Sequence, residues 1–305
     1  MAAFEKVDFV GRWRMWFAIS GVFLLLCIGA IALGGFNFGI DFTGGSKFTA
    51  SAVEGNPSPD EVREALPEGV RGEALPPQRF GESGYEVRTP GLSQEENTEV
   101  QQALEEEFGA EVSVTSISPT FGGQIRNQAL QAVGAALLII VLYISFRFAF
   151  AFALAAMAAL LHDILITVGF YALVGREVNL VTVVAVLTVL GYSLYDTIII
   201  FDRIRENTPE AGYNRRRYNE LANNSVRQVI MRSIYTSVCT LIPVTALLLF
   251  GESTLSDFAF ALLVGIAAGT YSSIFIATPV LCLYKEWRAG KNAPAHGAPE
   301  GAEAR

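Results

Sequence analysis

The sequence contains few charged residues and few of the side chains that enzymes most often use for catalysis. Charged residues make up 17% of the 305 residues, and there are 2 histidines and 3 cysteines. One histidine, His162, lies in an apolar run, and the other, His296, lies in a segment rich in Pro, Gly and Ala. A histidine-based metal site or hydrolase site is therefore not expected. The composition also excludes a soluble enzyme and a disordered scaffold.

A phosphate-binding loop is missing as well. Residues 44–47 read Gly-Gly-Ser-Lys and lack the Gly-Lys-Ser/Thr ending that such a loop requires. The three cysteines, Cys27, Cys239 and Cys282, all fall in apolar runs, so none is available for a disulfide in the polar part of the chain. We expect no enzyme activity, no cofactor and no metal ion.

Apolar residues are abundant, at 51% of the sequence, and the mean hydropathy is +0.38. A membrane-spanning helix needs about 20 predominantly apolar residues, and several runs have that length. The first run could be a signal peptide, but it is longer than the roughly 7 to 15 residues of a signal h-region. The sequence therefore predicts an α-helical membrane protein with six transmembrane helices, at residues 15–36, 128–147, 148–174, 180–201, 229–250 and 257–283.

The distribution of Lys and Arg predicts the orientation of these helices. Basic residues precede the first helix, connect the second to the third, cluster between 203 and 232, and follow the sixth. Cytoplasmic loops carry such an excess, and Trp13, Trp16 and Trp287 lie at the same boundaries, as in an interfacial aromatic belt. We therefore expect residues 1–14, 202–228 and 284–305 in the cytoplasm, the last of them disordered, and residues 37–127 on the outer, periplasmic side.

The segment between the first two helices is patterned like a small α+β domain. Strands are expected at 46–53, 69–75, 85–89 and 111–117, and helices at 59–66 and 93–108, which is the order of a ferredoxin-like split βαβ unit. Residues 36–127 hold 16 acidic and 6 basic residues, a net charge that argues against a nucleic-acid partner. Since the segment contains neither His nor Cys, we interpret it as a binding or levering module.

A carboxylate inside a predicted membrane helix is the strongest functional signal. Asp196 lies about 9 Å inside the end of its helix, at about 1.5 Å per residue. Inserting an Asp at the centre of a membrane helix costs about 2.5 to 3.5 kcal/mol. Such a residue therefore faces a partner or a cavity. Arg232, in the next and antiparallel helix, lies at similar depth. Two interpretations stay open: an ion pair that fastens the two helices, and a proton-binding carboxylate with Arg232 as its switchable counter-charge.

Residues His162 and Asp163 lie deeper, near the middle of the third predicted helix. Asp163 has two interpretations as well, a polar contact between helices and a part of a proton path. We expect His162, Asp163, Asp196 and Arg232 to take part in proton coupling.

Four motifs resemble those of the SecD/SecF family, within the RND superfamily. Residues 38–45, Phe-Gly-Ile-Asp-Phe-Thr-Gly-Gly, are similar to the family's Gly-Ile-Asp-Phe-x-Gly-Gly motif. The others are Leu-His-Asp at 161–163, Gly-Tyr-Ser-Leu-Tyr-Asp-Thr at 191–197 leading to Asp-Arg-Ile-Arg-Glu-Asn at 202–207, and Gly-Thr-Tyr-Ser-Ser at 269–273. Together they resemble the SecF branch of the family over nearly the whole chain.

The resemblance implies an accessory subunit of the bacterial Sec protein translocase in the inner membrane, which uses the proton motive force to promote preprotein translocation. It also implies partners: a SecD-like subunit, the SecY/SecE/SecG translocon, a YajC-like subunit, the preprotein substrate and membrane lipid. By motif position, Asp196 and Arg232 match the family's essential aspartate and arginine. Tyr195 departs from the family pattern, which commonly has Asn there.

We further expect the glycine-rich motif to act as a hinge between the first helix and the outer domain. Closely spaced glycines permit backbone angles that are closed to other residues, and hinges absorb such changes. The residues concerned are Gly39, Asp41, Gly44 and Gly45, and a static tight turn is the alternative. Two other functions stay open: half of an RND-type small-molecule exporter, which would need a larger outer domain, and a passive translocon scaffold, which would not need Asp196.

Overall fold

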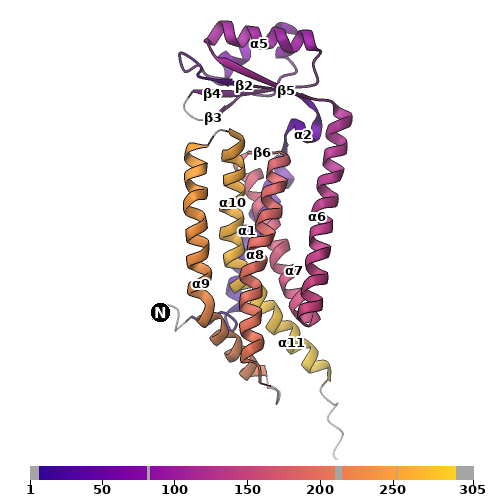
Figure 1. Ribbon diagram of the computed structural model, residues 1–305, viewed down its shortest axis with the longest axis vertical. Coiled ribbons are helices and arrows are strands. Elements are labelled where there is room, and N and C mark those ends of the chain that lie inside the picture. Colours follow the sequence, from indigo (N-terminus) through magenta and orange to yellow (C-terminus); the bar gives the residue numbers. More distant parts are fainter. Residues whose placement is uncertain (1–6, 81–82, 210–214, 252, 293–305) are drawn as a thin grey trace, which may run out of the picture.

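The structure, a computed structural model, describes residues 7–80, 83–209, 215–251 and 253–292. A long bundle of helices carries a small α+β domain on one end (Figure 1). Six helical segments in this part of the chain are long and apolar enough to cross a membrane, which confirms the predicted number. The first five are α1 (Trp13–Gly34), α6 (Pro119–Arg147), α7 (Phe150–Val174), α8 (Leu180–Asn207) and α9 (Arg215–Phe250). The sixth consists of α10 (Ser253–Ser272), the short π-helix η1 (Ser273–Ala277) and α11 (Thr278–Asn292).

Several helices continue beyond the apolar runs that predicted them. α6 begins nine residues before 128, at Pro119, α8 continues past 201 to Asn207, and α9 begins within the predicted cytoplasmic loop 202–228. Residues 284–292, predicted as disordered, are helical. The helices are longer than the predicted spans because hydropathy detects only the apolar part of a helix, and the prediction of disorder is wrong for residues 284–292. Residues 1–6, 210–214 and 293–305, which belong to the predicted N-terminal segment, loop and tail, lie outside the described residues.

Tertiary contacts explain why the end of α11 stays helical. Asn219 Nδ2 of α9 donates a hydrogen bond to Glu286 Oε1 at 2.7 Å. The ammonium group of Lys285 lies 4.3 Å from the centre of the Tyr218 ring, within the range of a cation–π interaction. Polar residues at the end of α11 are therefore fixed by α9.

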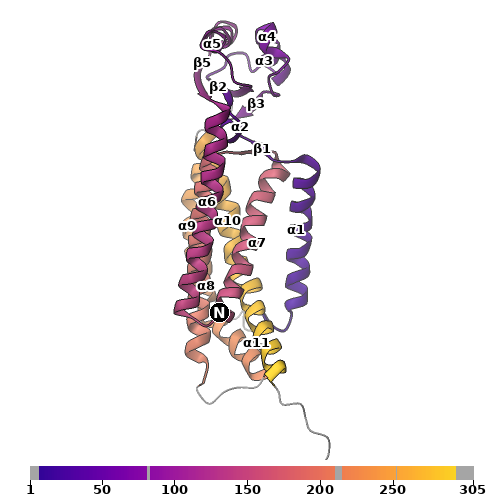
Figure 2. The same ribbon diagram turned by 90° about the vertical axis from the view of Figure 1, so that its right-hand side faces the viewer.

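Small residues allow the central helices of the bundle to approach closely. A Cβ atom on Gly265 of α10 would lie 2.3 Å from Val189 Cγ2 of α8, and one on Gly269 would lie 2.8 Å from Ser193 Cβ. On α7, a Cβ atom on Gly169 would lie 2.2 Å from Cys27 Cβ of α1, which packs beside α7 (Figure 2). Small residues at such positions let membrane helices pack backbone to backbone. Gly265 and Gly269 thus let α10 pack closely against α8.

The α+β domain, called the outer domain after its predicted position, has a four-stranded antiparallel sheet in the order β3-β4-β2-β5. The helices α3 (Pro59–Glu64), α4 (Glu68–Arg71) and α5 (Gln94–Phe108) belong to the same domain. The pairing is that of a split βαβ unit, in which the first and third strands are neighbours at the centre. The strands are β2 (Gly45–Ser51), β3 (Gln78–Phe80), β4 (Gly84–Thr89) and β5 (Glu111–Ile117).

One predicted strand of this domain is wrong. Residues 69–75 form no strand, since α4 occupies part of this range, and β3 follows only after Pro76 and Pro77. The side chain of Arg71 donates from Nε to the carbonyl oxygen of Leu66 at 3.1 Å. Because this bond and the buried Val70 hold the chain in a helical turn, the extended conformation is not adopted.

Short elements join the domain to the bundle. β1 (Asn37–Phe38), which follows α1, pairs in parallel with β6 (Glu177–Val178), which lies between α7 and α8. The backbone N–H of Gly39 donates to the carbonyl oxygen of Val178 at 2.9 Å. The helical turn α2 (Ile40–Thr43) comes next and leads directly into β2. The joint, which consists of β1, β6 and α2, therefore contacts both the bundle and the sheet.

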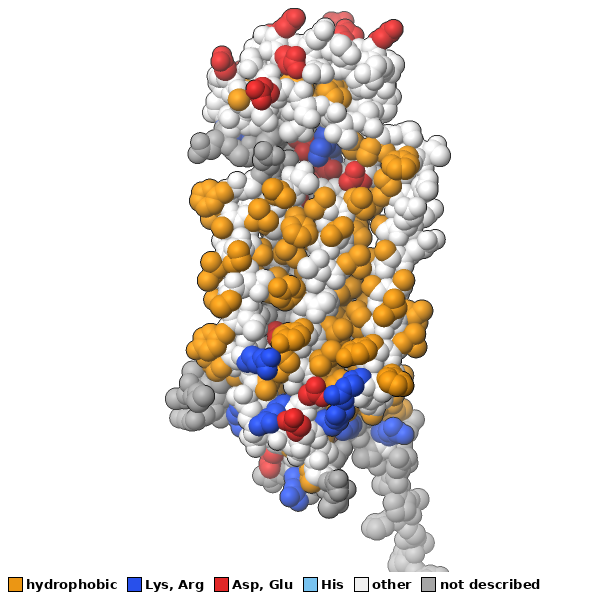
Figure 3. Space-filling model, viewed as in Figure 1, with side chains coloured by type: hydrophobic (Ala, Val, Ile, Leu, Met, Phe, Trp, Pro, Cys, Tyr) orange, Lys and Arg blue, Asp and Glu red, His pale blue; other side chains and the backbone are white. Residues whose placement is uncertain are grey.

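The surface seen in Figure 3 divides into three zones along the long axis. Apolar side chains cover the bundle, acidic side chains lie over the outer domain, and basic side chains gather at the opposite end. Both described ends of the chain, at residues 7 and 292, lie at that basic end (Figures 1 and 2). The zones agree with the charge distribution from which the orientation was predicted.

Candidate functional site

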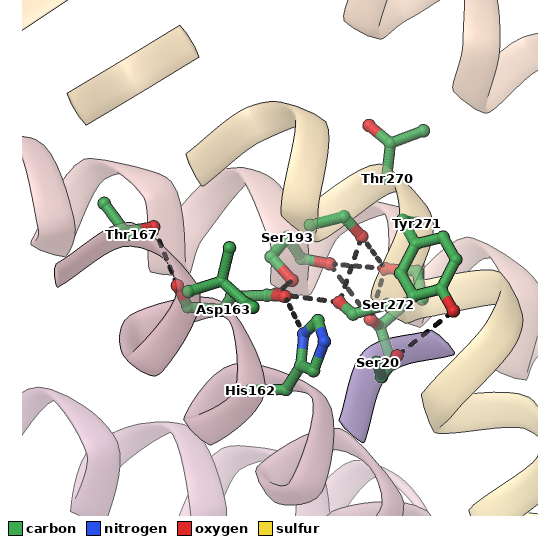
Figure 4. A network of polar contacts seen from close by, with 12 residues as sticks. Ser20, His162, Asp163, Thr167, Ser193, Thr270, Tyr271 and Ser272 are labelled. Atoms are coloured by element: carbon green, nitrogen blue, oxygen red, sulfur yellow. Dashed lines mark hydrogen bonds and ion pairs between the residues drawn. The ribbon is translucent and has the colours of Figure 1, made fainter. Parts of the chain in front are cut away.

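A buried polar layer lies inside the bundle, with Asp163 of α7 at its centre (Figure 4). Asp163 is 0% exposed. Its Oδ2 accepts hydrogen bonds from the hydroxyl groups of Ser193 of α8, at 2.6 Å, and Ser272 of α10, at 2.8 Å. Since a buried carboxylate without partners would be costly, these hydroxyls stabilise it. Asp163 thus joins three helices, as the interpretation of a polar contact between helices requires.

His162 extends the layer toward α1. Its Nδ1 lies 3.0 Å from Asp163 Oδ1, and its ring stacks on that of Tyr271, with centroids 6.0 Å apart. The Tyr271 hydroxyl donates to the carbonyl oxygen of Trp16 at 3.0 Å and accepts from Ser20 at 3.1 Å. Hydrogen bonds therefore join α1 to Tyr271, and the ring contact of Tyr271 with His162 continues this connection to Asp163 (Figure 4).

On the other side, the layer meets the π-helix η1. Ser273, the first residue of η1, shares a hydrogen bond of 2.8 Å with Thr197 of α8 and donates to the Ser193 carbonyl oxygen at 3.2 Å. Single π-helical turns inside longer helices occur frequently at functional sites. Here the turn directs Ser272 to Asp163 and Ser273 to α8.

Asp196 lies one turn beyond Ser193 on α8 and is 6% exposed. The Ser233 hydroxyl of α9 lies beside its carboxyl group without the geometry of a hydrogen bond. Arg232 acts on Asp196 by its charge, and its Nη2 donates to the Tyr195 hydroxyl at 3.0 Å. Arg232 is therefore directed to Tyr195 in this structure, and both interpretations of Asp196 and Arg232 stay predictions. Tyr195, the departure from the family pattern, is the group that holds Arg232.

The glycine-rich motif lies at the other end of α8, at the joint. Gly44 has a φ of +74°, and a Cβ atom there would lie 2.6 Å from Pro119 Cα. Gly45 has a φ of +131°, and its Cβ would lie 2.4 Å from the carbonyl oxygen of Thr89. Asp41 Oδ2 accepts a hydrogen bond from the backbone N–H of Leu180, the first residue of α8. The motif is thus packed between α6, β4 and α8.

The structure brings some of the predicted site residues together and separates others. His162 and Asp163 belong to the buried layer, Asp196 is buried one turn beyond Ser193 of that layer, and Arg232 is bonded to Tyr195 on the same helix as Asp196. Gly39, Asp41, Gly44 and Gly45 form a separate group at the joint, and α8 connects the two groups. Whether these residues couple proton movement to motion stays a prediction.

Sequence reasoning missed the hydroxyl groups that complete the layer. Ser193 and Ser272 lie inside quoted motifs, but hydroxyl groups are common in apolar helices and often bond to their own backbone, as Thr188 does to the Val184 carbonyl oxygen at 2.8 Å. The sequence did contain a signal for Ser193, because this residue lies three positions before Asp196 and therefore on the same face of the helix.

The chemistry available in this layer is proton binding and hydrogen-bond exchange. Within the described ranges, no group of three or more His, Cys, Asp or Glu side chains is placed to hold a metal ion. Hydroxyl groups both donate and accept, and an imidazole ring carries a proton on either nitrogen. The arrangement is therefore that of a polytopic membrane protein with titratable groups inside its transmembrane bundle.

Comparisons with known proteins place the chain in a family. Residues 97–287 match the family described as "Protein export membrane protein SecD/SecF, C-terminal", and residues 29–53 match the "SecD/SecF GG Motif". The chain belongs to the SecD/SecF family, and its relatives are named as protein translocase subunits. The resemblance predicted from the four motifs is confirmed.

Individual relatives show how much of the chain is shared. "Protein translocase subunit SecF" of Mycobacterium tuberculosis strain H37Rv is 38% identical over 298 residues, which cover 92% of this chain and 67% of the relative. SecF of Desulfurispirillum indicum is 38% identical over 283 residues, covering 88% and 89%. The crystal structure of SecDF from Thermus thermophilus, described as a translocon-associated membrane protein, matches with a TM-score of 0.84 and 37% identity. That match covers 92% of this chain but 38% of the longer SecDF chain.

Proposed function

We propose that this chain is an accessory subunit that uses the proton motive force, together with a SecD-like subunit, to promote preprotein translocation across the bacterial inner membrane. The observation that carries this proposal is the state of Asp196. It is a buried carboxylate on a transmembrane helix, with a hydroxyl beside it and with the nearby Arg232 bonded to Tyr195. A fixed counter-charge would hold it ionised, whereas Asp196 can gain or lose a proton when Arg232 moves.

The route from Asp196 to the outer domain runs through α8. Asp196 lies sixteen residues after Leu180, which corresponds to about 24 Å along a helix. Leu180 is bonded to Asp41 in the glycine-rich motif. A shift of α8 caused by a change in the polar layer would therefore reach the joint directly. The driving energy is sufficient, since one elementary charge that crosses 100 mV is worth about 2.3 kcal/mol.

Orientation and partners form part of the same proposal. The basic end of the bundle faces the cytoplasm together with both termini, and the acidic α+β domain lies in the periplasm. A SecD-like partner is supported by the Thermus thermophilus SecDF chain, of which this chain matches 38%. The family resemblance adds the SecY/SecE/SecG translocon, a YajC-like subunit and the preprotein as further partners.

The test is the substitution Asp196→Asn, which keeps the shape of the side chain and removes its titration. Asp202→Asn is the matched control, because Asp202 lies on the same helix but is 39% exposed. In inverted membrane vesicles, we expect Asp196→Asn to reach the same membrane abundance but to lose the stimulation of preprotein translocation by the proton motive force. Asp202→Asn should keep it. Normal, uncoupler-sensitive translocation with Asp196→Asn would refute the proposal.

A further inference from the structure

A second group of buried charges lies at the joint, outside the transmembrane bundle. Glu177 of β6 and Glu86 of β4 are 6% and 8% exposed, line the same cleft, and lie on either side of the Arg88 guanidinium, which is within ion-pair distance of both carboxyl groups. One carboxyl belongs to the bundle side and the other to the sheet of the outer domain. Two carboxylates that face each other repel, and a proton shared between them removes the repulsion.

The two carboxyl groups of this pair do not have the same cations beside them. Lys47 Nζ of β2 lies 3.0 Å from Glu86 Oε2. Arg88 lies 3.5 Å from Glu177 Oε2 and 3.8 Å from Glu86 Oε1 and also donates to the carbonyl oxygen of Phe38, so its charge is shared. Lys47 therefore keeps Glu86 ionised, and Glu177 is the carboxyl that takes the proton.

The remaining charged groups near the pair do not alter this assignment. Arg176, next to Glu177, forms an ion pair of 2.6 Å with Asp257 of α10, so these two charges balance each other. Arg79 of β3 lines the same cleft and has contacts of its own. Arg88 is thus a cation within ion-pair distance of Glu177.

A cleft of about 700 Å³ gives solvent access to the pair. Its lining includes both carboxyl groups, Arg176, Gln78 and Phe250, and it lies between the outer domain and the ends of the helices. Gly39 makes room for the pair, because a Cβ atom at this position would lie 2.1 Å from Glu177 Oε1. Protons can thus reach Glu177 without entering the transmembrane layer.

We propose that Glu177 and Glu86 form a second proton-binding site, which fastens the outer domain to the bundle when the proton is bound and loosens this contact when it is released. The site goes beyond the proposed function and does not depend on Asp196. The proton concentration outside the membrane would then set how firmly the domain is held.

The direction of the pH dependence follows from the environment of each carboxyl group. Burial, together with the neighbouring Glu86 carboxyl, raises the pKa of Glu177 from its ordinary 4.5 to about 8. Burial opposes the charge of Glu86, but the hydrogen bond with Glu177 and the charge of Lys47 outweigh it and lower the pKa of Glu86. Once the domain is released, Glu177 returns to its ordinary pKa, so the attached state binds more protons. Attachment should therefore weaken as pH rises from 4.5 to about 8 and change little above that.

The experiment measures the distance between the domain and the bundle in the full chain. Spin labels are placed at Glu99→Cys on α5 and Leu255→Cys on α10, both exposed, in a Cys239→Ser background that leaves only the buried Cys27 and Cys282. In lipid nanodiscs, we expect one short distance at acidic pH. A longer distance should appear as pH rises, with a ratio of long to short that grows by up to about tenfold per pH unit.

Substitutions assign the transition to the pair. Glu177→Gln should keep the short distance at every pH, because the amide is uncharged and still hydrogen bonds to Glu86. Glu86→Gln should also abolish the transition, since Glu177 then stays ionised beside Arg88 and Lys47. Glu111→Gln, an exposed carboxyl in β5, is the matched control and should behave like the wild type.

Two outcomes would overturn the proposal: a wild-type distance that is independent of pH, or a transition that persists in both glutamine variants. If a glutamine variant does not fold, infrared difference spectra of the labelled parent chain provide the second measurement. A protonated carboxyl band should disappear with the same midpoint as the distance change, and its absence would also refute the site. The transition should persist in Asp196→Asn, which separates this site from the buried layer.

Discussion

The Asp41 carboxylate accepts a hydrogen bond of 2.9 Å from the backbone N–H of Leu180 at the start of α8. The first N–H groups of a helix have no partner within the helix, and a carboxylate there also interacts favourably with the helix dipole. Asp41 thus caps a transmembrane helix from a segment that is distant in sequence. The contact joins the glycine-rich motif to the helix that carries Asp196.

Removing this cap should cost measurable stability. We expect Asp41→Ala to lower the free energy of unfolding by about 1 kcal/mol, the usual cost of losing a capping side chain. Asp41→Asn should cost less, because its amide oxygen still accepts the bond. Thermal unfolding of the purified chain in detergent measures both. Equal stability of Asp41→Ala and the wild type would show that the contact contributes nothing.

The glycines of the motif should tolerate alanine poorly because of close packing. Gly44→Ala combines a positive φ with a contact of 2.6 Å to the backbone of Pro119. Gly55, with a φ of +77° and nothing within 4 Å, is the matched control for the backbone angle alone. Gly55→Ala should lower the free energy of unfolding by about 1 to 2 kcal/mol, and Gly44→Ala should lower it by more. Similar losses in the two variants would argue against the packing explanation. This comparison tests packing, and the hinge stays a prediction.

The hydroxyl groups around Asp163 should matter more than other hydroxyls of the same helices. Ser272→Ala removes a donor to a fully buried carboxylate, and we expect a loss of about 1 to 3 kcal/mol. Thr188→Ala is the control, because the Thr188 hydroxyl is exposed and bonds only to its own helix. Thermal unfolding should therefore shift for Ser272→Ala and stay near the wild-type value for Thr188→Ala. An unchanged Ser272→Ala would show that Asp163 is stabilised in another way.

Reporter fusions should verify the orientation. An enzyme that is active only outside the cytoplasm should be active when fused after Ser83 or Gly251, at the end of the bundle that carries the outer domain. The same enzyme should be inactive after Gly212, between the basic ends of α8 and α9. Activity after Gly212 would contradict the proposed topology.

Features set by local chemistry could be predicted from the sequence. The helix expected at 93–108 is present as α5, and its capping box of Ser93 and Glu96 depends only on residues three positions apart. The apolar runs predict six spans because a bilayer fixes their length. Asp196 could be singled out because a carboxylate is costly in an apolar helix.

Features that depend on distant segments could not be predicted. The pairing of β1 with β6 joins two strands of two residues each that lie far apart in the chain. Such short strands have no hydrophobic period, and the pair Glu86 and Glu177 becomes visible only once this pairing is known. Arg232 was expected beside Asp196 from its depth alone, but depth does not fix the direction of a side chain, and Tyr195 holds it instead.

The π-helix η1 determines which way α11 faces. A π-helical turn contains about one residue more than an α-helical turn, and each residue of an α-helix rotates the chain by about 100°. The faces of α11 are therefore rotated by about one residue relative to an uninterrupted continuation of α10. In this rotated position, Lys285 and Glu286 contact Tyr218 and Asn219 of α9. Deleting a single residue from 273–277 would leave α10 and α11 intact in length and composition but would turn the basic end of the last helix away from α9.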